Sequence, residues 1–114
     1  MKVLLINGSC NINGCTYTAL DEISRTLNNQ GIETEIIQLG SSPYRDCIGC
    51  NNCRKTEDSK CVFDDVVNQI IEKAKTSDGF IFGSPVYYAH PSGRLLSVMD
   101  RVFYAGGKHF AYKP

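Results

Sequence analysis

Four cysteines fall close together in the sequence CIGCNNCRKTEDSKC at residues 47–61. Three of them are separated by two residues each, and the last follows after seven more; this four-cysteine set is Cys47, Cys50, Cys53 and Cys61. A zinc site commonly pairs two separated Cys-x₂-Cys units. Three closely spaced thiolates with a fourth nearby suit a bulky iron–sulfur cluster better. The spacing therefore favours a cluster, with zinc and free thiols as the alternatives.

A second polar segment, GSCNINGCT at residues 8–16, follows the apolar run KVLLING and is called the first loop. It lacks the Gly-x-Gly-x-x-Gly pattern of dinucleotide sites and the lysine of a Walker A loop. Backbone N–H groups at the start of a helix can bind a lone phosphate, as on FMN, without a lysine. The candidate residues of this loop are Ser9, Asn11, Asn13 and Thr16. The alternative is an ordinary strand-to-helix loop, and we expect Cys10 to bind no metal.

The second loop, GSPVYYAHPSG at residues 83–93, carries two consecutive tyrosines after a Ser-Pro pair. Aromatic faces and backbone N–H groups are what an isoalloxazine ring needs from a protein. In the alternative interpretation Tyr87 and Tyr88 are half-buried surface aromatics, and Ser92 caps the next helix. His90 has no identifiable partner, and no side chain is nominated as a catalytic base.

The elements that must position these loops alternate along the chain. Apolar runs predict buried parallel strands at residues 2–8, 32–39 and 79–85. Helical spacing predicts a helix that ends near Gly31, one that Asp64 or Asp65 caps, and one that ends at residues 106–107. Such alternation predicts a doubly wound parallel sheet, covered on both faces. In the strand order 2-1-3 the two loops meet at the topological switch point.

Together, GSCNINGCT, CIGCNNC…C and GSPVYYAHPSGRLLSVMDRVFYAGG closely resemble the NADPH-dependent FMN reductase and iron–sulfur flavoprotein group. The resemblance covers nearly the whole chain and implies an α/β, flavodoxin-like fold. It implies that Ser9, Cys15 and Thr16 surround the FMN phosphate. It places along the flavin ring Pro85, Val86, Tyr87 and Tyr88. It also implies one [4Fe–4S] cluster on the four-cysteine set, although related flavoproteins with similar cysteines carry no cluster.

The resemblance also bears on domain organisation. We expect residues 1–114 to form one partial flavodoxin-like FMN-binding domain with a cysteine-rich insertion at 44–62, called the cysteine segment. The fourth and fifth strands of the five-stranded fold are expected to be absent from this chain. The third strand would then present an open apolar edge, which favours pairing. We therefore expect a fragment, a truncated product or a homo-oligomer that covers this edge.

Composition restricts the partners. The chain has 12 Lys and Arg residues against 12 Asp and Glu residues, so no net charge recruits nucleic acid or an anionic membrane. The N-terminal apolar run is too short for a signal peptide or a membrane span. We expect a cytoplasmic protein whose six cysteines are not paired as disulfides.

The leading hypothesis is an FMN-dependent oxidoreductase or electron-transfer flavoprotein with a [4Fe–4S] cluster. NAD(P)H or a redox protein would be the electron donor, and a small molecule the acceptor. The alternative is a non-catalytic, zinc-binding or metal-free flavodoxin-like fragment.

Overall fold

Three parallel strands form the central sheet of the protein, for which the computed structural model describes residues 1–110. They are β1 (Lys2–Asn7), β2 (Glu33–Gln38) and β3 (Gly79–Gly83). The order is β2-β1-β3, with β1 paired to β2 from Lys2–Glu33 to Asn7–Gln38. The predicted order 2-1-3 and the flavodoxin-like fold are thus confirmed.

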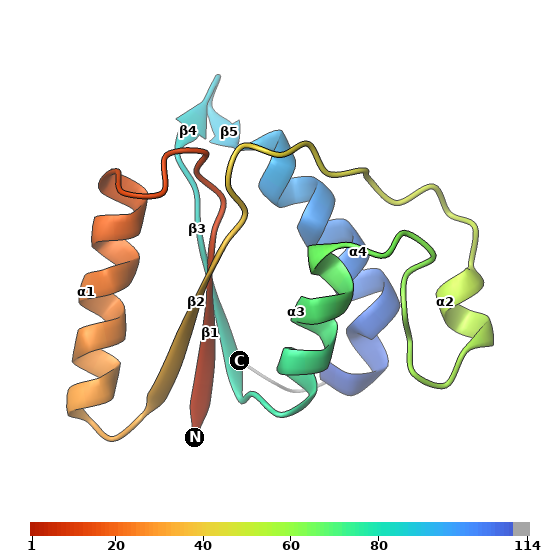
Figure 1. The fold of residues 1–114 in the computed structure, drawn as a ribbon, viewed down its shortest axis with the longest axis horizontal. Coiled ribbons are helices and arrows are strands. Elements are labelled where there is room, and N and C mark those ends of the chain that lie inside the picture. The colour runs from red at the N-terminus through yellow and green to blue at the C-terminus, as the bar shows by residue number, and fades with distance from the viewer. Residues whose placement is uncertain (111–114) are drawn as a thin grey trace.

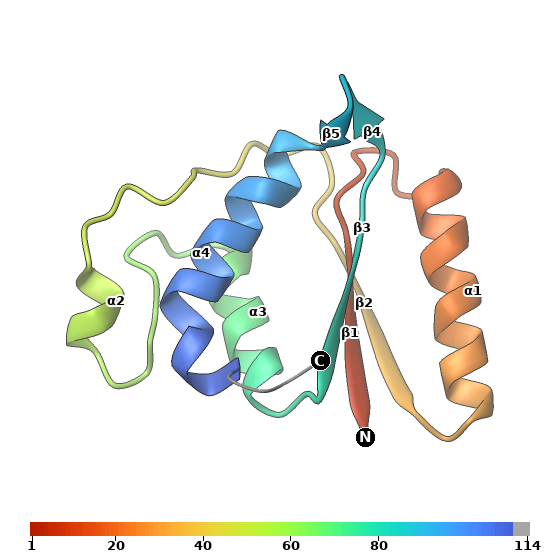
Figure 2. The ribbon, with the colours of Figure 1, turned by 180° about the vertical axis from the view of Figure 1, so that it is seen from behind.

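Helices cover both faces of this sheet, as the sequence predicts. Helix α1 (Cys15–Asn29) lies on one face, and α3 (Val66–Lys75) and α4 (Gly93–Phe110) lie together on the other (Figures 1 and 2). The core on the α3–α4 side is built from fully buried aliphatic side chains: Leu4, Ile6, Val67, Ile70, Ile71, Val98 and Val102. In the described residues, no helix combines the length and apolar character needed to cross a membrane.

Helix termini follow the capping signals in the sequence. After α1, Gly31 adopts a positive φ of 78°, a conformation that glycine reaches without strain. Of the two candidate caps for α3, Asp65 is the one used, because its Oδ1 accepts from the Val67 amide at 3.0 Å. At α4, the Ser92 hydroxyl oxygen accepts from the Leu95 amide at 3.3 Å, so Ser92 caps this helix as the alternative interpretation of the second loop proposed.

The predicted end of the last helix at residues 106–107 is wrong, because α4 continues to Phe110. Gly106 is buried, and a Cβ atom at this position would collide with the Phe110 ring. That ring packs edge-to-face on Phe80 with centroids 5.3 Å apart. The packing outweighs the roughly 1 kcal/mol that each glycine costs a helix. Gly106 therefore makes room for an aromatic contact and does not end the helix.

Two small elements were not predicted. The second loop forms a hairpin of β4 (Val86–Tyr87) and β5 (His90–Pro91), which projects from the end of the sheet (Figure 1). These labels do not denote the fourth and fifth flavodoxin strands; in residues 1–110 the parallel sheet has three strands. The cysteine segment, expected to be irregular, contains a short helix, α2 (Asn52–Lys55).

Glu35 on β2 forms ion pairs with lysines from two other elements, Lys73 Nζ at 2.5 Å and Lys2 Nζ at 3.4 Å. The hydrogen bond from Lys73 holds the pKa of Glu35 below its ordinary value of 4.5. A lowered pKa in the folded state stabilises the protein above the unfolded pKa, and this stabilisation disappears as pH falls through the folded pKa.

We therefore expect Glu35→Gln to lower the free energy of unfolding by about 0.5 kcal/mol near neutral pH, since the pair is partly exposed. Below pH 4.5 this difference should shrink toward zero. Urea unfolding of both proteins across this pH range measures it. A difference that stays constant into strong acid would contradict the assignment.

Candidate functional site

The first and second loops meet at the carboxyl ends of β1 and β3, as the sequence predicts (Figure 1). The Gly8 amide donates to the Gly83 carbonyl at 2.8 Å. The Ser92 hydroxyl donates to the Gly8 carbonyl at 2.9 Å. These bonds join residues far apart in the sequence and fix the two loops side by side at the switch point.

Side chains of the first loop stabilise its own backbone. The Asn7 Oδ1 accepts from the Ser9 amide at 3.0 Å, and the Ser9 Oγ accepts from the Asn11 amide at 3.1 Å. The Asn11 Oδ1 in turn accepts from the Asn13 amide at 3.3 Å. Such successive side-chain-to-backbone bonds shape a turn. Ser9, Asn11 and Asn13 thus determine the path of the chain toward α1.

The N-terminus of α1 is chemically open to an anion. The N-cap residue of α1 is Gly14, which has no side chain that could cap the helix. No acidic residue lies in the first turn. Cys15 is exposed and Thr16 is half-buried at this end. The partial positive charge of the helix N-terminus therefore has no side-chain counterpart here. This is where a phosphate would fit.

The hairpin residues point to solvent. Val86 is 75% exposed, Tyr87 48% and Tyr88 99%, whereas Pro85 is half-buried. The alternative in which both tyrosines are half-buried is thus not what the structure shows. A hydrogen bond with Cys10 raises the pKa of the Tyr87 hydroxyl above its ordinary value of 10.0, so the hairpin contacts the first loop.

Arg94 brings a third segment to this edge of the sheet. Its Nε donates to the Ser42 carbonyl at 2.9 Å, and its Nη2 donates to the Ser41 carbonyl at 3.2 Å. Sequence reasoning missed this residue because its partners lie about fifty positions away. Arg94 thus holds the chain just before the cysteine segment beside the two loops.

Gly8→Ala tests the close approach of the loops. A Cβ atom on Gly8 would lie 2.8 Å from the Leu95 Cβ and 3.1 Å from the Gly83 carbonyl oxygen. Neither atom is the end of a flexible side chain, so we expect the free energy of unfolding to fall by about 1–3 kcal/mol. Gly93→Ala is the matched control, because nothing lies within 4 Å of its added Cβ. Equal stability of the two variants in urea would contradict this packing.

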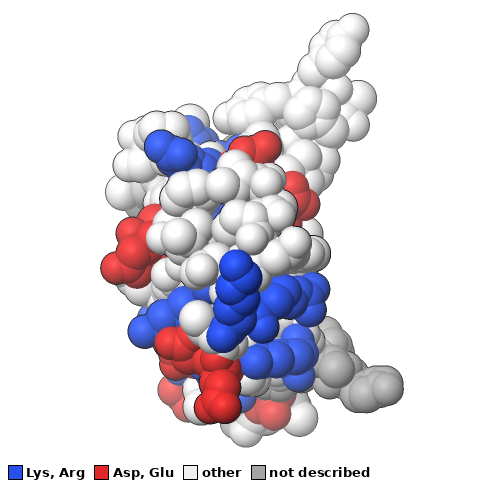
Figure 3. Space-filling model, turned by 90° about the vertical axis from the view of Figure 1, so that its right-hand side faces the viewer, with Lys and Arg blue, Asp and Glu red and all other residues white. Residues whose placement is uncertain are grey.

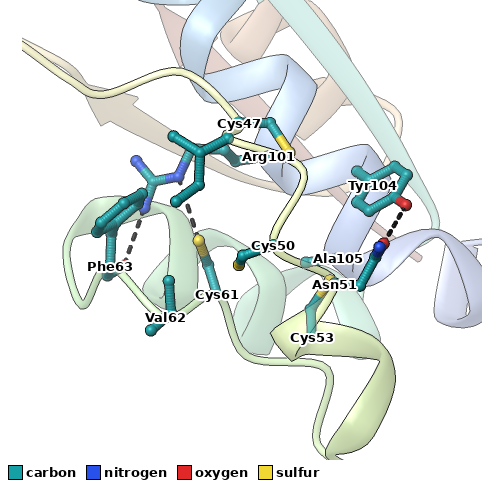
Figure 4. A pocket seen from close by; sticks show the side chains of 11 residues that line it. Cys47, Cys50, Asn51, Cys53, Cys61, Val62, Phe63, Arg101, Tyr104 and Ala105 are labelled. Carbon is teal, nitrogen blue, oxygen red and sulfur yellow. Dashed lines mark hydrogen bonds between the residues drawn. The ribbon is translucent and has the colours of Figure 1, made fainter.

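The four-cysteine set lines one pocket, although its members come from separate parts of the cysteine segment (Figure 4). Helix α4 supplies the opposite wall through Arg101, Tyr104 and Ala105. Cys53 on α2 is buried, and Cys61 is half-buried. All six cysteines of the chain lie within residues 1–110 and are free thiols.

The four sulfurs do not converge as they stand. Within residues 1–110, no three Cys, His, Asp or Glu side chains are close enough to share a metal ion. The donor chemistry nevertheless fits a thiolate-bound group, because four free thiols share one pocket that also holds a buried cation. A bound cluster would require the segment to close around it.

That cation is Arg101, whose side chain is 1% exposed. Its Nε donates to the Cys61 sulfur at 3.3 Å, and its Nη1 and Nη2 donate to the two oxygens of Asp65 at 2.7 and 2.9 Å. Burial lowers the pKa of Arg101, but the hydrogen bonds to Asp65 and Cys61 outweigh this and raise its pKa above the ordinary arginine value. The guanidinium is therefore charged and points into the pocket.

The basic residues around the pocket are mostly engaged elsewhere. Arg54 lies over the Tyr104 ring, 4.5 Å from its centroid, and Lys60 pairs with Asp58 at 3.7 Å. Figure 3 shows that both signs of charge are interspersed on this side of the molecule. Arg101, which the sequence analysis did not single out, is the buried cation that contacts a cysteine sulfur of this pocket.

The family profile described as NADPH-dependent FMN reductase matches residues 1–114, which is the whole chain. The chain belongs to this family. An iron–sulfur flavoprotein of Methanocaldococcus jannaschii is 43% identical over 101 residues, which are 89% of this chain and 51% of that protein. An iron–sulfur flavoprotein of Archaeoglobus fulgidus is 33% identical over 101 residues, or 89% of this chain and 48% of that protein.

A third relative, an iron–sulfur flavoprotein of Methanosarcina thermophila, is 28% identical over 99% of this chain and 58% of its own length. This family member therefore spans about half the length of the curated relatives it matches. The sequence-based assignment to the family is confirmed.

Proposed function

We propose that this chain binds FMN and forms the flavin site of an FMN-dependent oxidoreductase or electron-transfer flavoprotein. The proposal rests on the N-terminus of α1, which lies at the topological switch point and has no side-chain cap. The chain also belongs to a family described as FMN reductases. We assign the phosphate side to the first-loop residues Ser9, Asn11, Asn13, Cys15 and Thr16. We assign the ring side to Pro85, Val86, Tyr87 and Tyr88.

FMN, when bound, supplies the transfer of electrons to and from substrate. The residues of the chain would hold and orient it. Amides at Cys15 and Thr16 would donate to phosphate oxygens, and the Thr16 hydroxyl would add a further donor. The exposed Tyr87 ring offers a face for stacking, and Tyr87 is held in the hairpin by its pairing with His90. The proposal assigns no proton transfer to a side chain.

We further propose that the four-cysteine set holds a [4Fe–4S] cluster, which when bound supplies one-electron transfer. The shared pocket, the buried Arg101 and the names of the relatives support this assignment. Zinc bound to the same thiolates, in a non-catalytic fragment, is the second candidate, because four cysteine thiolates are also a common ligand set for zinc. Iron and zinc content of the purified protein separates the two.

The proposed donor is NAD(P)H or a redox protein, and the proposed acceptor is a small molecule. A homo-oligomer is proposed because β3 pairs only with β1 in residues 1–110, which leaves its other edge without a strand there. Light scattering that shows only monomer would refute it. A reducing compartment such as the cytoplasm suits six free thiols.

Gly14→Asp tests the flavin site. A carboxylate at this position would cap α1 and repel a phosphate, so FMN affinity should fall about tenfold or more while the helix stays folded. Riboflavin, which lacks the phosphate, is the matched ligand and should bind both proteins alike. Quenching of flavin fluorescence measures both affinities. If the unaltered chain binds no FMN, or if Gly14→Asp binds FMN equally well, the proposed phosphate site is wrong.

A further inference from the structure

Arg101 is the largest fully buried side chain in the described residues. A guanidinium has five N–H donors, and here each has its own acceptor. Three of these bonds reach Cys61 Sγ and both Asp65 oxygens, as described above. The other two reach the backbone carbonyls of Arg45 at 3.2 Å and Phe63 at 2.9 Å. Only the planar, five-donor guanidinium group of an arginine can make all five of these hydrogen bonds at once.

The acceptors flank the four-cysteine set on both sides. Arg45 lies two residues before Cys47, and Phe63 lies two residues after Cys61. A single side chain on α4 thus fixes the position of both ends of the segment that carries the thiols. The Phe63 ring adds to this arrangement, because the guanidinium carbons of Arg45 and Arg101 lie 4.7 and 5.4 Å from its centroid.

Four of the five hydrogen bonds of Arg101 serve the stability of the fold and need no further role. Asp65 neutralises the buried charge, and the two carbonyls would otherwise need other donors. The bond from Nε to Cys61 is different, because a thiol is a weak acceptor and a thiolate a strong one. This donor is aimed at a half-buried sulfur in the wall of the cysteine pocket.

We propose that Arg101 is a positioning residue for Cys61, holding its sulfur in place as the fourth ligand of the group bound by the four-cysteine set. The inference rests on the proposed metal-binding function. Outer hydrogen bonds of this kind orient ligands and commonly change metal affinity 10- to 100-fold. Asn68 already holds the Cys61 backbone through bonds of 2.8 and 3.1 Å, so the bond from Arg101 Nε acts on the sulfur itself.

Anaerobic titration of the full chain with Co²⁺ tests the proposal, since the sulfur-to-cobalt absorption band grows with the number of bound thiolates. Arg101→Lys keeps the charge but cannot reproduce the fork. We expect its Co²⁺ affinity to fall about 10- to 100-fold and its band to match that of Cys61→Ser, the three-thiolate reference. Arg54→Lys is the matched control, because Arg54 packs on the ring of Tyr104 beside the pocket and its replacement should leave both readings unchanged.

A second variant separates positioning from folding. Asp65→Asn weakens the ion pair but leaves the Nε bond to Cys61, so we expect a lower melting temperature with the full four-thiolate band. If Arg101→Lys also melts earlier but keeps the full band and affinity, Arg101 is only structural and the inference is overturned. A reduced band in Asp65→Asn would overturn it too. If the unaltered chain binds no Co²⁺, the proposed metal function itself fails, and the inference fails with it.

Discussion

Cys47→Ala should lose its iron and keep its FMN. Removal of one thiolate leaves a four-iron cluster without a full ligand set, so we expect iron per chain to fall at least about tenfold. FMN affinity should stay within about twofold, because the two sites contact different parts of α4. Gly93 begins the helix beside the loops, and Arg101 faces the cysteine pocket eight residues later, about 12 Å along the axis.

The matched control for this prediction is Cys10→Ala. Cys10 is an exposed thiol of the first loop, which contacts Tyr87 and lies outside the four-cysteine set. Its replacement should leave iron content unchanged. Iron and FMN are measured on the same anaerobically purified samples. Loss of both cofactors from Cys47→Ala would mean that the sites are structurally inseparable and would contradict the account.

Asp65→Ala should destabilise the protein by about 3–5 kcal/mol, which is the usual cost of leaving a buried charge without its partner. The carboxylate binds the Arg101 guanidinium through both oxygens, and its Oδ1 also caps α3. A domain of this size has roughly 5–15 kcal/mol of total stability, so the loss is a large fraction of it.

Asp64→Ala provides the comparison, because the neighbouring carboxylate accepts one bond from Asn68 Nδ2 at 3.2 Å and no bond from Arg101. We expect it to cost about 1 kcal/mol or less. Urea unfolding of both variants measures the difference. If the two variants were equally stable, the Arg101–Asp65 pair would not be the stabilising buried ion pair that this prediction assumes.

Local signals predicted most of the fold. The apolar runs identified all three strands of the parallel sheet, and their alternation with helices predicted a parallel sheet covered on both faces. The resemblance to the flavodoxin-like family implied the order 2-1-3, which the structure shows. Gly31, Asp65 and Ser92 act at helix termini through bonds within a few residues, so sequence alone identified them. The meeting of the first and second loops followed from the topology.

Long-range packing decided two of the failures, and a local turn conformation decided the third. Residues 106–107 were expected to end a helix, but the Phe110 ring needs the space that Gly106 leaves. The hairpin was missed because Tyr88 and Ala89 take φ values of 47° and 67°, which neither residue type favours. Arg101 was missed because its partners lie 36 to 56 positions away in sequence.

The most direct test of the two-cofactor proposal is an anaerobic absorption spectrum of the freshly purified protein, before and after dithionite. The account predicts resolved flavin bands over a broad iron–sulfur shoulder that dithionite bleaches. Flavin bands without the shoulder would support the flavin-dependent oxidoreductase but not the cluster. The four-cysteine set would then hold zinc or remain as free thiols. A spectrum with neither feature, unchanged when FMN is added, would contradict the central claim that this chain binds a flavin.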